Sequence, residues 1–272
     1  MWARAVGLAA LLPSLVLLGA APAHAEEALR LFAAGSLTRA MTALLAEAGV
    51  PAEQIATPVF GPSGVLRERI EQGAPADILA SADMQQPRRL AQERGNRSVI
   101  LFARNRMCVL ARQALDVTPG TLLDRMLDPR LRLATSTPRA DPAGDYAWAV
   151  FARAEALRPG AEATLEAKAL KLVGGPDTKP LVAGHGHVEG VFLADKADMM
   201  LGYCSGAAEV TRDVPGLVSV PLPSELTVEP AYGMVMLTDN TLAGRFAVFV
   251  MSERGQAILE RHGFVPVAWP GG

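Results

Sequence analysis

What this sequence lacks narrows its function before any motif is considered. It contains only 2 cysteines and 4 histidines, and 5% of its residues are aromatic. Lysine and arginine number 26 against 28 acidic residues, so the net charge is −2. Proteins that bind nucleic acid or acidic membranes normally carry a basic stripe. This chain has none, so we expect no nucleic-acid partner.

Long apolar runs are also missing once the N-terminal segment is set aside. After residue 25 no stretch approaches the roughly 20 apolar residues that a membrane-spanning helix needs. Residues 1–25 have the parts of an export signal: Arg4, an apolar core over Val6–Leu18, and a small-x-small cleavage pattern at residues 23–25. We expect an exported chain that begins near Glu26. An uncleaved membrane anchor is the alternative.

Strand and helix patterns alternate through the first part of the mature chain. Half of the sequence is apolar and 20% is charged, which is ample for a large core or for two smaller lobes. The apolar patterns predict strands over Leu29–Ala33, Ile55–Phe60 and Ala76–Ser81, and helices over Leu37–Ala48, Gly64–Gln72 and Pro87–Arg94. This alternation is typical of an α/β fold with a mostly parallel sheet and helices on both faces.

The same alternation restarts in the second part of the chain. Predicted strands are Met107–Ala111, Arg132–Thr135, Met199–Cys204, Leu217–Pro221 and Tyr232–Leu237. Predicted helices are Thr121–Leu127, Pro142–Leu157, Ala161–Leu172, Val188–Ala194 and Leu242–His262. No low-complexity linker separates the parts, so two lobes would have to share crossing strands rather than a single tether.

Two short loops place glycine and serine at the end of a predicted strand and before a predicted helix. They are Ala33–Leu37, which contains Ser36, and Phe60–Gly64, which contains Ser63. Ligands of parallel sheets bind beyond the carboxyl ends of the strands. A serine hydroxyl and the unpaired N–H groups of a helix start can bind an anion without any lysine or arginine. The alternative is that each serine simply caps its own helix.

Two further positions offer neutral hydrogen-bond donors. Asp141 and Pro142 form a helix start, with Asp141 as the cap, so the N–H groups of Ala143 and Gly144 should point outward. Tyr203 ends a predicted strand, and its phenol is a neutral donor. A half-buried tyrosine without a ligand is the alternative there.

The histidines and cysteines leave alternatives open. His185 and His187 could contact a metal or an anion, but a loop that enters a helix is the simpler interpretation, and we expect no metal site. Cys108 and Cys204 lie in predicted strands. In an oxidising compartment they form either a disulfide or two buried thiols.

These motifs, in this order, resemble the periplasmic molybdate-binding proteins of ABC importers. The matching segments span nearly all of the mature chain: Ala33–Leu37, Phe60–Gly64, Ile70–Asp77, Ser81–Asp83, Pro142–Gly144 with Tyr146-Ala147, Ala197-Asp198, Tyr203 and Gly263-Phe264. The resemblance implies a two-lobed α/β binding protein with two crossing strands. Lobe I would cover residues 26–104 and 216–272, and lobe II residues 105–215.

The resemblance also implies which residues hold the ligand. Four contribute donors from the two lobes: the hydroxyls of Ser36 and Ser63, the backbone N–H of Ala143 and the hydroxyl of Tyr203. A further backbone N–H, at the start of the helix before the tyrosine strand, falls on His187 or Val188. The segment after the tyrosine departs from the family's Thr-Asp-Ala, because Cys204 displaces it.

The implied function is that of a periplasmic receptor rather than an enzyme, with no cofactor. It would capture molybdate or tungstate and dock, as a monomer, onto an inner-membrane ABC permease. A deprotonated dianion has only acceptors and suits neutral donors, whereas a protonated phosphate needs an acceptor such as Asp141. Sulfate, phosphate or a small organic anion on the same fold is thus the alternative. From another class, the alternative is a secreted hydrolase that uses Ser63, although Gly61–Val65 lacks the second glycine of Gly-x-Ser-x-Gly.

Overall fold

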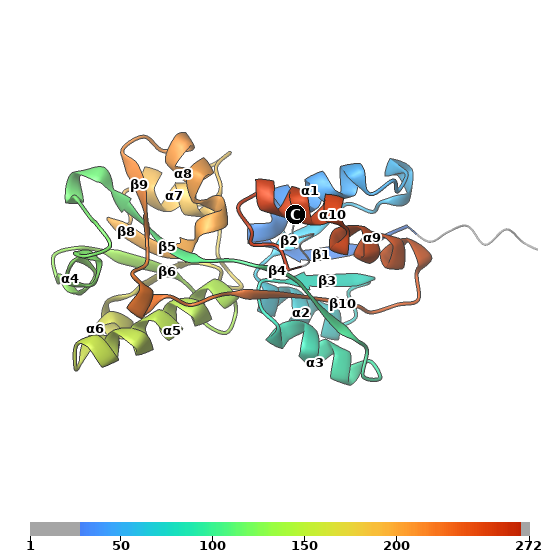
Figure 1. The fold of residues 1–272 in the computed structure, drawn as a ribbon, viewed down its shortest axis with the longest axis horizontal. Helices are drawn as coiled ribbons and strands as arrows, with labels where there is room; N and C mark the ends of the chain where they lie inside the picture. The colour runs from blue at the N-terminus through green and yellow to red at the C-terminus, as the bar shows by residue number, and fades with distance from the viewer. Residues whose placement is uncertain (1–27, 268–272) are drawn as a thin grey trace, which may run out of the picture.

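The protein has two lobes, and each is built on a five-stranded sheet. The computed structural model describes residues 28–267, so the expected export signal at residues 1–25 lies outside the described residues. Lobe I is on the right of Figure 1 and lobe II on the left, with helices on both faces of each sheet. The predicted α/β, two-lobed architecture is confirmed.

Lobe I has the strand order β2-β1-β3-β10-β4. Its strands are β1 Leu31–Ala34, β2 Val59–Gly61, β3 Ile78–Ser81, β4 Val99–Arg104 and β10 Ala231–Met236. Its helices are α1 Thr38–Glu47, α2 Ser63–Glu71, α3 Gln85–Glu93, α9 Thr241–Met251 and α10 Glu253–Arg261, with short 3-10 turns at Gly35–Leu37 and Ala52–Gln54. Strand β1 is parallel to β2 and β3, whereas β10 is antiparallel to β3 and β4.

Lobe II repeats this plan with the order β7-β6-β8-β5-β9. Its strands are β5 Met107–Arg112, β6 Leu133–Ser136, β7 Leu170–Val173, β8 Met199–Tyr203 and β9 Leu217–Pro221. Its helices are α4 Leu122–Leu127, α5 Pro142–Leu157, α6 Ala161–Lys168, α7 His187–Leu193 and α8 Ala207–Asp213, with 3-10 turns at Gln113–Leu115 and Cys204–Gly206. Strand β6 is parallel to β7 and β8, and β5 is antiparallel to β8 and β9.

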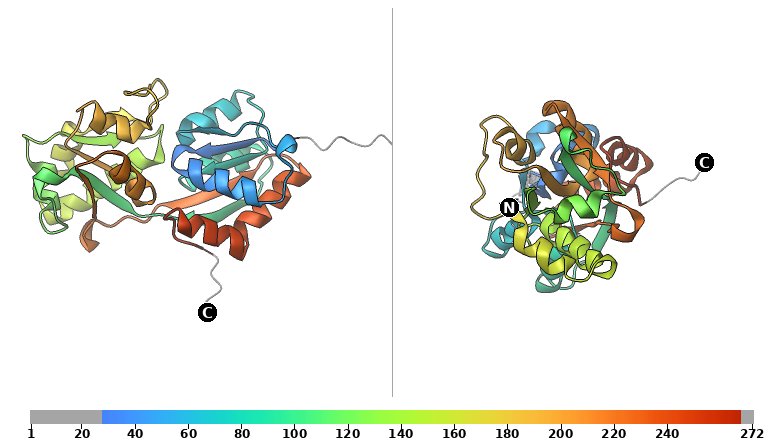
Figure 2. Two further views of the ribbon diagram at one scale, coloured as in Figure 1. Left: turned by 90° about the horizontal axis from the view of Figure 1, so that it is seen from above. Right: turned by 90° about the vertical axis from the view of Figure 1, so that its left-hand side faces the viewer.

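The chain crosses between the lobes twice. The first crossing is Asn105-Arg106, between β4 and β5, and the second is residues 222–230, between β9 and β10, with a 3-10 turn at Ser224–Leu226. Both run along the middle of the molecule in Figure 1, and Figure 2 shows from above how they join the two lobes. The expected return to lobe I at residue 216 is wrong, because β9 pairs with β5 of lobe II. The chain returns only after Pro221.

Apolar side chains cover both faces of each sheet. In lobe I one cluster, with Tyr232 and Phe246, packs under α1, α9 and α10, and a second, with Leu66 and Leu90, packs under α2 and α3. Lobe II likewise has one cluster under α4, α5 and α6 and another under α7 and α8. Within residues 28–267, every helix is too short or too polar to span a lipid bilayer. The strand ends at the junction of the lobes are therefore held by separate apolar clusters in each lobe.

The structure differs from the predicted elements at three places. Residues Leu170–Val173 form strand β7, not the end of a helix, because they pair with β6 after α6 stops at Lys168. Strand β4, Val99–Arg104, was not expected, and it pairs with β10. The predicted C-terminal helix is broken at Ser252, whose extended backbone and side chain cap α10.

Candidate functional site

A cleft of about 420 Å³ lies between the two lobes. Five of the strands end at it, and their last residues all line the cleft: Ala34 of β1, Gly61 of β2, Ser136 of β6, Val173 of β7 and Tyr203 of β8. These are the carboxyl ends of strands in the parallel parts of the two sheets. Such ends are the usual place for a ligand in an α/β fold. The cleft therefore lies where the sequence predicted a site.

The structure brings most of the predicted site residues together. Five line the cleft: Ser36, Ala143, His187, Val188 and Tyr203. Ser63 does not line it. This serine is fully buried, and its hydroxyl oxygen accepts a hydrogen bond from the backbone N–H of Ala82 at 3.1 Å.

Neither serine caps the helix that follows it. Helix α1 begins after Leu37 and α2 after Pro62, and both starts lack a side-chain cap. The Ser36 hydroxyl lies 3.0 Å from that of Tyr232 instead. The simple capping alternative is therefore wrong for both serines.

The hydroxyl of Tyr203 stands out among the polar groups of the cleft by its hydrogen bonding. It is buried without a hydrogen-bond partner, and among residues 28–267 only Thr135 Oγ1 shares this state. The Tyr203 ring lies edge-on between Tyr146 and Tyr232, with centroid distances of 6.3 and 5.6 Å. Burial raises the pKa of this phenol well above its usual value, so it stays a protonated donor. Because leaving a buried donor unpaired costs about 1–3 kcal/mol, the atom points to a bound acceptor.

The start of α5 is arranged differently from the expectation. Asp141 is the predicted cap, and its carboxylate accepts the Ala143 N–H at 3.2 Å and the Ser136 hydroxyl at 2.5 Å. The Gly144 N–H donates to the Asp141 carbonyl. Both N–H groups that were expected to point outward therefore have a partner in Asp141. The Asp141 carboxyl also lines the cleft, and burial raises its pKa, which favours the protonated form.

The start of α7 contributes backbone donors at the mouth of the cleft. The helix begins at His187 without a side-chain cap, and its first internal bond runs from the Gly190 N–H to the Gly186 carbonyl. The N–H groups of His187 and Val188 thus belong to its first turn, whose donors lack partners within the helix. In residues 28–267 no three His, Cys, Asp or Glu side chains gather in a way that could hold a metal ion.

Direct contacts hold the lobes together around the cleft. Arg39 of α1 forms an ion pair with Glu209 of α8, and both residues line the cleft. The Gly64 N–H of lobe I donates to the Ala140 carbonyl of lobe II at 3.0 Å. The Tyr146 hydroxyl of lobe II accepts the Ala231 N–H at 3.2 Å. The structure therefore has contacts between the lobes on several sides of the site.

Comparison with known proteins identifies the family. A family model of bacterial extracellular solute-binding proteins matches residues 29–265. This chain belongs to that family. A protein of Pasteurella multocida, itself called uncharacterised, is 33% identical over 240 residues, which are 88% of this chain and 98% of that protein.

Solved structures of other solute-binding proteins share the fold. The periplasmic molybdate-binding protein of Azotobacter vinelandii is 18% identical, with a TM-score of 0.68, over 88% of this chain and 100% of that one. The sulfate-binding protein SubI of Mycobacterium tuberculosis is 17% identical, with a TM-score of 0.70, over 89% and 87%. At these identities the likeness shows the fold alone.

Two further features of this solute-binding protein bear on its chemistry. The family and fold are those of binding proteins, which are generally not enzymes, and the burial of Ser63 against Ala82 does not favour the hydrolase alternative.

The sequence analysis missed Ser136, although it follows a predicted strand just as Ser36 does. Asn105 and Tyr232 were also missed, since only their contacts across the junction single them out.

Proposed function

We propose that this protein is the periplasmic receptor of an ABC importer and that it captures a tetrahedral oxyanion, molybdate or tungstate, in the cleft between its lobes. The observation that carries the proposal is the buried, unpartnered hydroxyl of Tyr203 at the end of β8. The Ser36 hydroxyl and the first N–H groups of α7, at His187 and Val188, add donors around it. Ser63 and the Ala143 N–H would join them only if their present hydrogen bonds rearrange or are shared.

A site of neutral donors suits a fully deprotonated dianion. Such an ion presents only acceptor oxygens, so each donor can pair with one of them. The chain's negative charge gives no long-range attraction, and Arg39 in the cleft wall is paired with Glu209, so local dipoles have to supply most of the binding energy. One structural relative is named for molybdate and another for sulfate, which supports an oxyanion. Donors from both lobes would favour closure of the cleft when the ion binds.

The first test is a titration of the mature chain with molybdate, tungstate, sulfate and phosphate, in which calorimetry and thermal melting measure binding. A ligand at a hundred times its dissociation constant should stabilise the fold by about 2.7 kcal/mol. We expect Ser36→Ala to weaken binding at least about tenfold, since it removes a donor to a charged group. The matched control is Ser219→Ala, at an exposed position on β9. Equal affinities of the Ser36 variant and the wild type would contradict this site.

The Asp141 carboxylate favours a second candidate, an oxyanion that carries its own proton, such as hydrogen phosphate. Its place in the cleft wall, where the ionised carboxylate can accept the proton of such an anion, is the observation behind this candidate. Under this alternative Asp141→Asn, which keeps the helix cap, should lose phosphate affinity while sulfate or molybdate affinity rises. If molybdate alone binds the wild type, this candidate is wrong.

A further inference from the structure

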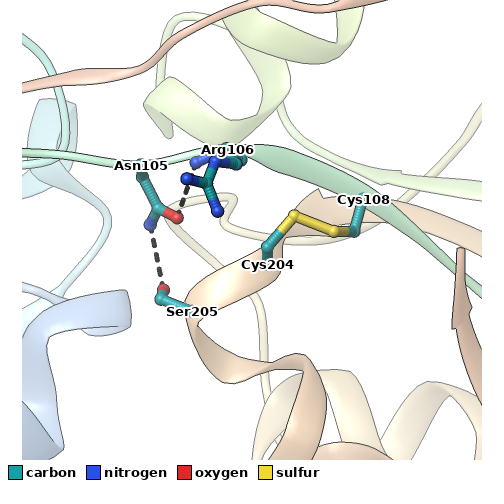
Figure 3. The surroundings of a disulfide bond; sticks show 5 residues. All are labelled: Asn105, Arg106, Cys108, Cys204 and Ser205. Atoms are coloured by element: carbon teal, nitrogen blue, oxygen red, sulfur yellow. Dashed lines mark hydrogen bonds between the residues drawn. A yellow bond between two sulfur atoms is a disulfide. The ribbon is translucent and has the colours of Figure 1, made fainter. Parts of the chain in front are cut away.

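A chain of hydrogen bonds at the junction of the lobes connects the cleft to the first crossing segment. Asn105 Nδ2 lies 3.1 Å from the Tyr232 hydroxyl and 2.9 Å from the Ser205 hydroxyl. The Tyr232 hydroxyl in turn lies 3.0 Å from that of Ser36. Ser36 and Ser205 both line the cleft, one on each lobe. Figure 3 shows Asn105 between the backbone of Arg106 and the side chain of Ser205.

The chemistry of the Asn105 amide fixes the direction of its own hydrogen bonds. Asn105 Oδ1 accepts the backbone N–H of Arg106 at 2.8 Å, and an N–H can only donate. The other end of the amide is therefore the NH₂ group, which gives one hydrogen to Tyr232 and one to Ser205. The Tyr232 hydroxyl accepts a hydrogen from Asn105 and can give its own to Ser36, since either atom of the Tyr232–Ser36 pair can be the donor. The hydroxyl hydrogens of Ser36 and Ser205 then remain free for a third partner.

We infer that Asn105 is a positioning residue that turns one serine hydroxyl of each lobe into a donor toward the bound oxyanion. It acts directly on Ser205, which becomes a further solute-binding residue, and through Tyr232 on Ser36. The inference rests on the proposed function, because it needs a solute that accepts both hydrogens. It also explains why a polar side chain that is 1% exposed stands in the crossing segment.

The surroundings of the relay keep it in place. Tyr232 is fully buried, and the rings of Phe102, Tyr203 and Phe264 lie edge-on around it, with centroid distances from 5.3 to 6.3 Å. The disulfide between Cys108 and Cys204 fixes the segment that carries Ser205 against β5, which begins two residues after Asn105 (Figure 3). Both partners of the amide are thus held at fixed positions relative to it.

A double-mutant cycle tests the relay with the oxyanion that the wild type binds among molybdate, tungstate, sulfate and phosphate. Tyr232→Phe keeps the ring but removes the oxygen that directs Ser36, so affinity should fall about five- to tenfold. In a Ser36→Ala background the same change should have no further effect, because the directed hydroxyl is gone. Ser219→Ala is the control, since Ser219 lies at an exposed position on β9 and does not line the cleft.

Ser205→Ala tests the branch on lobe II and should weaken binding about tenfold, against no change for Ser219→Ala. Thermal melting of each variant without ligand verifies that it folds. Independent, multiplying effects of Tyr232→Phe and Ser36→Ala, or wild-type affinity of Ser205→Ala, would overturn the relay while leaving the oxyanion receptor intact. A wild-type protein that binds none of the four oxyanions would overturn both proposals.

Discussion

At the residue scale, Tyr203 combines burial with an unmet hydrogen bond. Its strand-end position could be predicted from the sequence, but its isolation could not, since that depends on rings from both lobes. The three tyrosines of the chain, Tyr146, Tyr203 and Tyr232, all meet at the junction of the lobes. Burial raises the pKa of the Tyr146 phenol to about 12, so it too is protonated at physiological pH. The junction is thus polar yet uncharged at these positions.

Tyr203→Phe should separate the ligand role of this hydroxyl from a structural one. Without ligand, the variant should be as stable as the wild type, or about 1 kcal/mol more stable, because a buried unpaired donor is removed and the ring stays. Oxyanion affinity should fall at least about tenfold, because the variant lacks the hydroxyl that donates a hydrogen bond to the charged ligand. Thermal melting and calorimetry measure the two effects. A destabilised variant with unchanged affinity would show that the hydroxyl serves the fold.

Asp141 makes folding stability depend on pH. Its folded pKa is raised above the ordinary 3.8, so the folded state holds this proton more tightly than the unfolded state. The Asp141 carboxyl therefore costs no folding stability at low pH. Folding stability is lost as the pH rises above 3.8 and through the raised pKa of the folded state. Asp141→Asn should therefore melt higher than the wild type at pH 7, and the two should converge near pH 3. A wild type that melts higher at pH 7 would contradict this.

At the scale of elements, the sequence predicted strands and helices best where one local pattern decided them. Helix α5 has its cap, its N-terminal proline and its apolar spacing within one stretch, and it runs over Pro142–Leu157 as expected. Strand β7 was lost inside a predicted helix, because Leu170 and Lys171 are exposed and only pairing with β6 makes them a strand. Strand β9 lies in lobe II for the same reason, because it pairs with β5, which is distant in the sequence. Local patterns thus predicted the elements, and distant pairing decided their neighbours.

The disulfide joins two predicted strands whose cysteines the sequence left as either a bonded pair or two free thiols. Cys108 of β5 and Cys204 after β8 are 96 residues apart, with Cα atoms 5.1 Å from each other. A bond across so long a loop stabilises by up to about 4 kcal/mol, chiefly by restricting the unfolded chain. We expect the variant with both Cys108→Ser and Cys204→Ser to melt several degrees lower and to bind oxyanion more weakly, since Ser205 is next in the chain. The wild type in the presence of a reductant should show the same lower melting temperature and weaker binding as this variant. A titration of free thiols verifies that the disulfide is reduced.

At the scale of the whole molecule, the two crossings allow the lobes to move against each other, and the contacts across the cleft oppose opening. Arg39 supplies the ion pairs among these contacts, with Glu209 and, at 3.9 Å, with Asp213, and the side chains of Arg39 and Glu209 are 47% and 29% exposed. A partly exposed pair contributes less than about 1 kcal/mol and is screened by salt. The pair can therefore bias an equilibrium between open and closed lobes without locking it.

Arg39→Ala should shift the ligand-free protein toward open lobes, and high salt should have the same effect on the wild type. Small-angle scattering would show this as a larger radius of gyration, which returns to the wild-type value when saturating ligand closes the cleft. Arg88→Ala, at an exposed position on α3, is the matched control. A radius that changes neither with Arg39→Ala nor with salt would mean that the pair has no part in closure.

The route of the chain through the lobes has a consequence for how the protein matures. Lobe II is one continuous stretch from β5 to β9, whereas the sheet of lobe I needs β10, which follows all of lobe II in the sequence. A chain that emerges from a membrane pore with its N-terminus first can complete lobe II while β1 to β4 still wait for their last strand. Until then the edges of β3 and β4 that β10 will join are unpaired and prone to wrong association. The interval between the two crossings is therefore the stage at which this protein most needs protection by a folding helper.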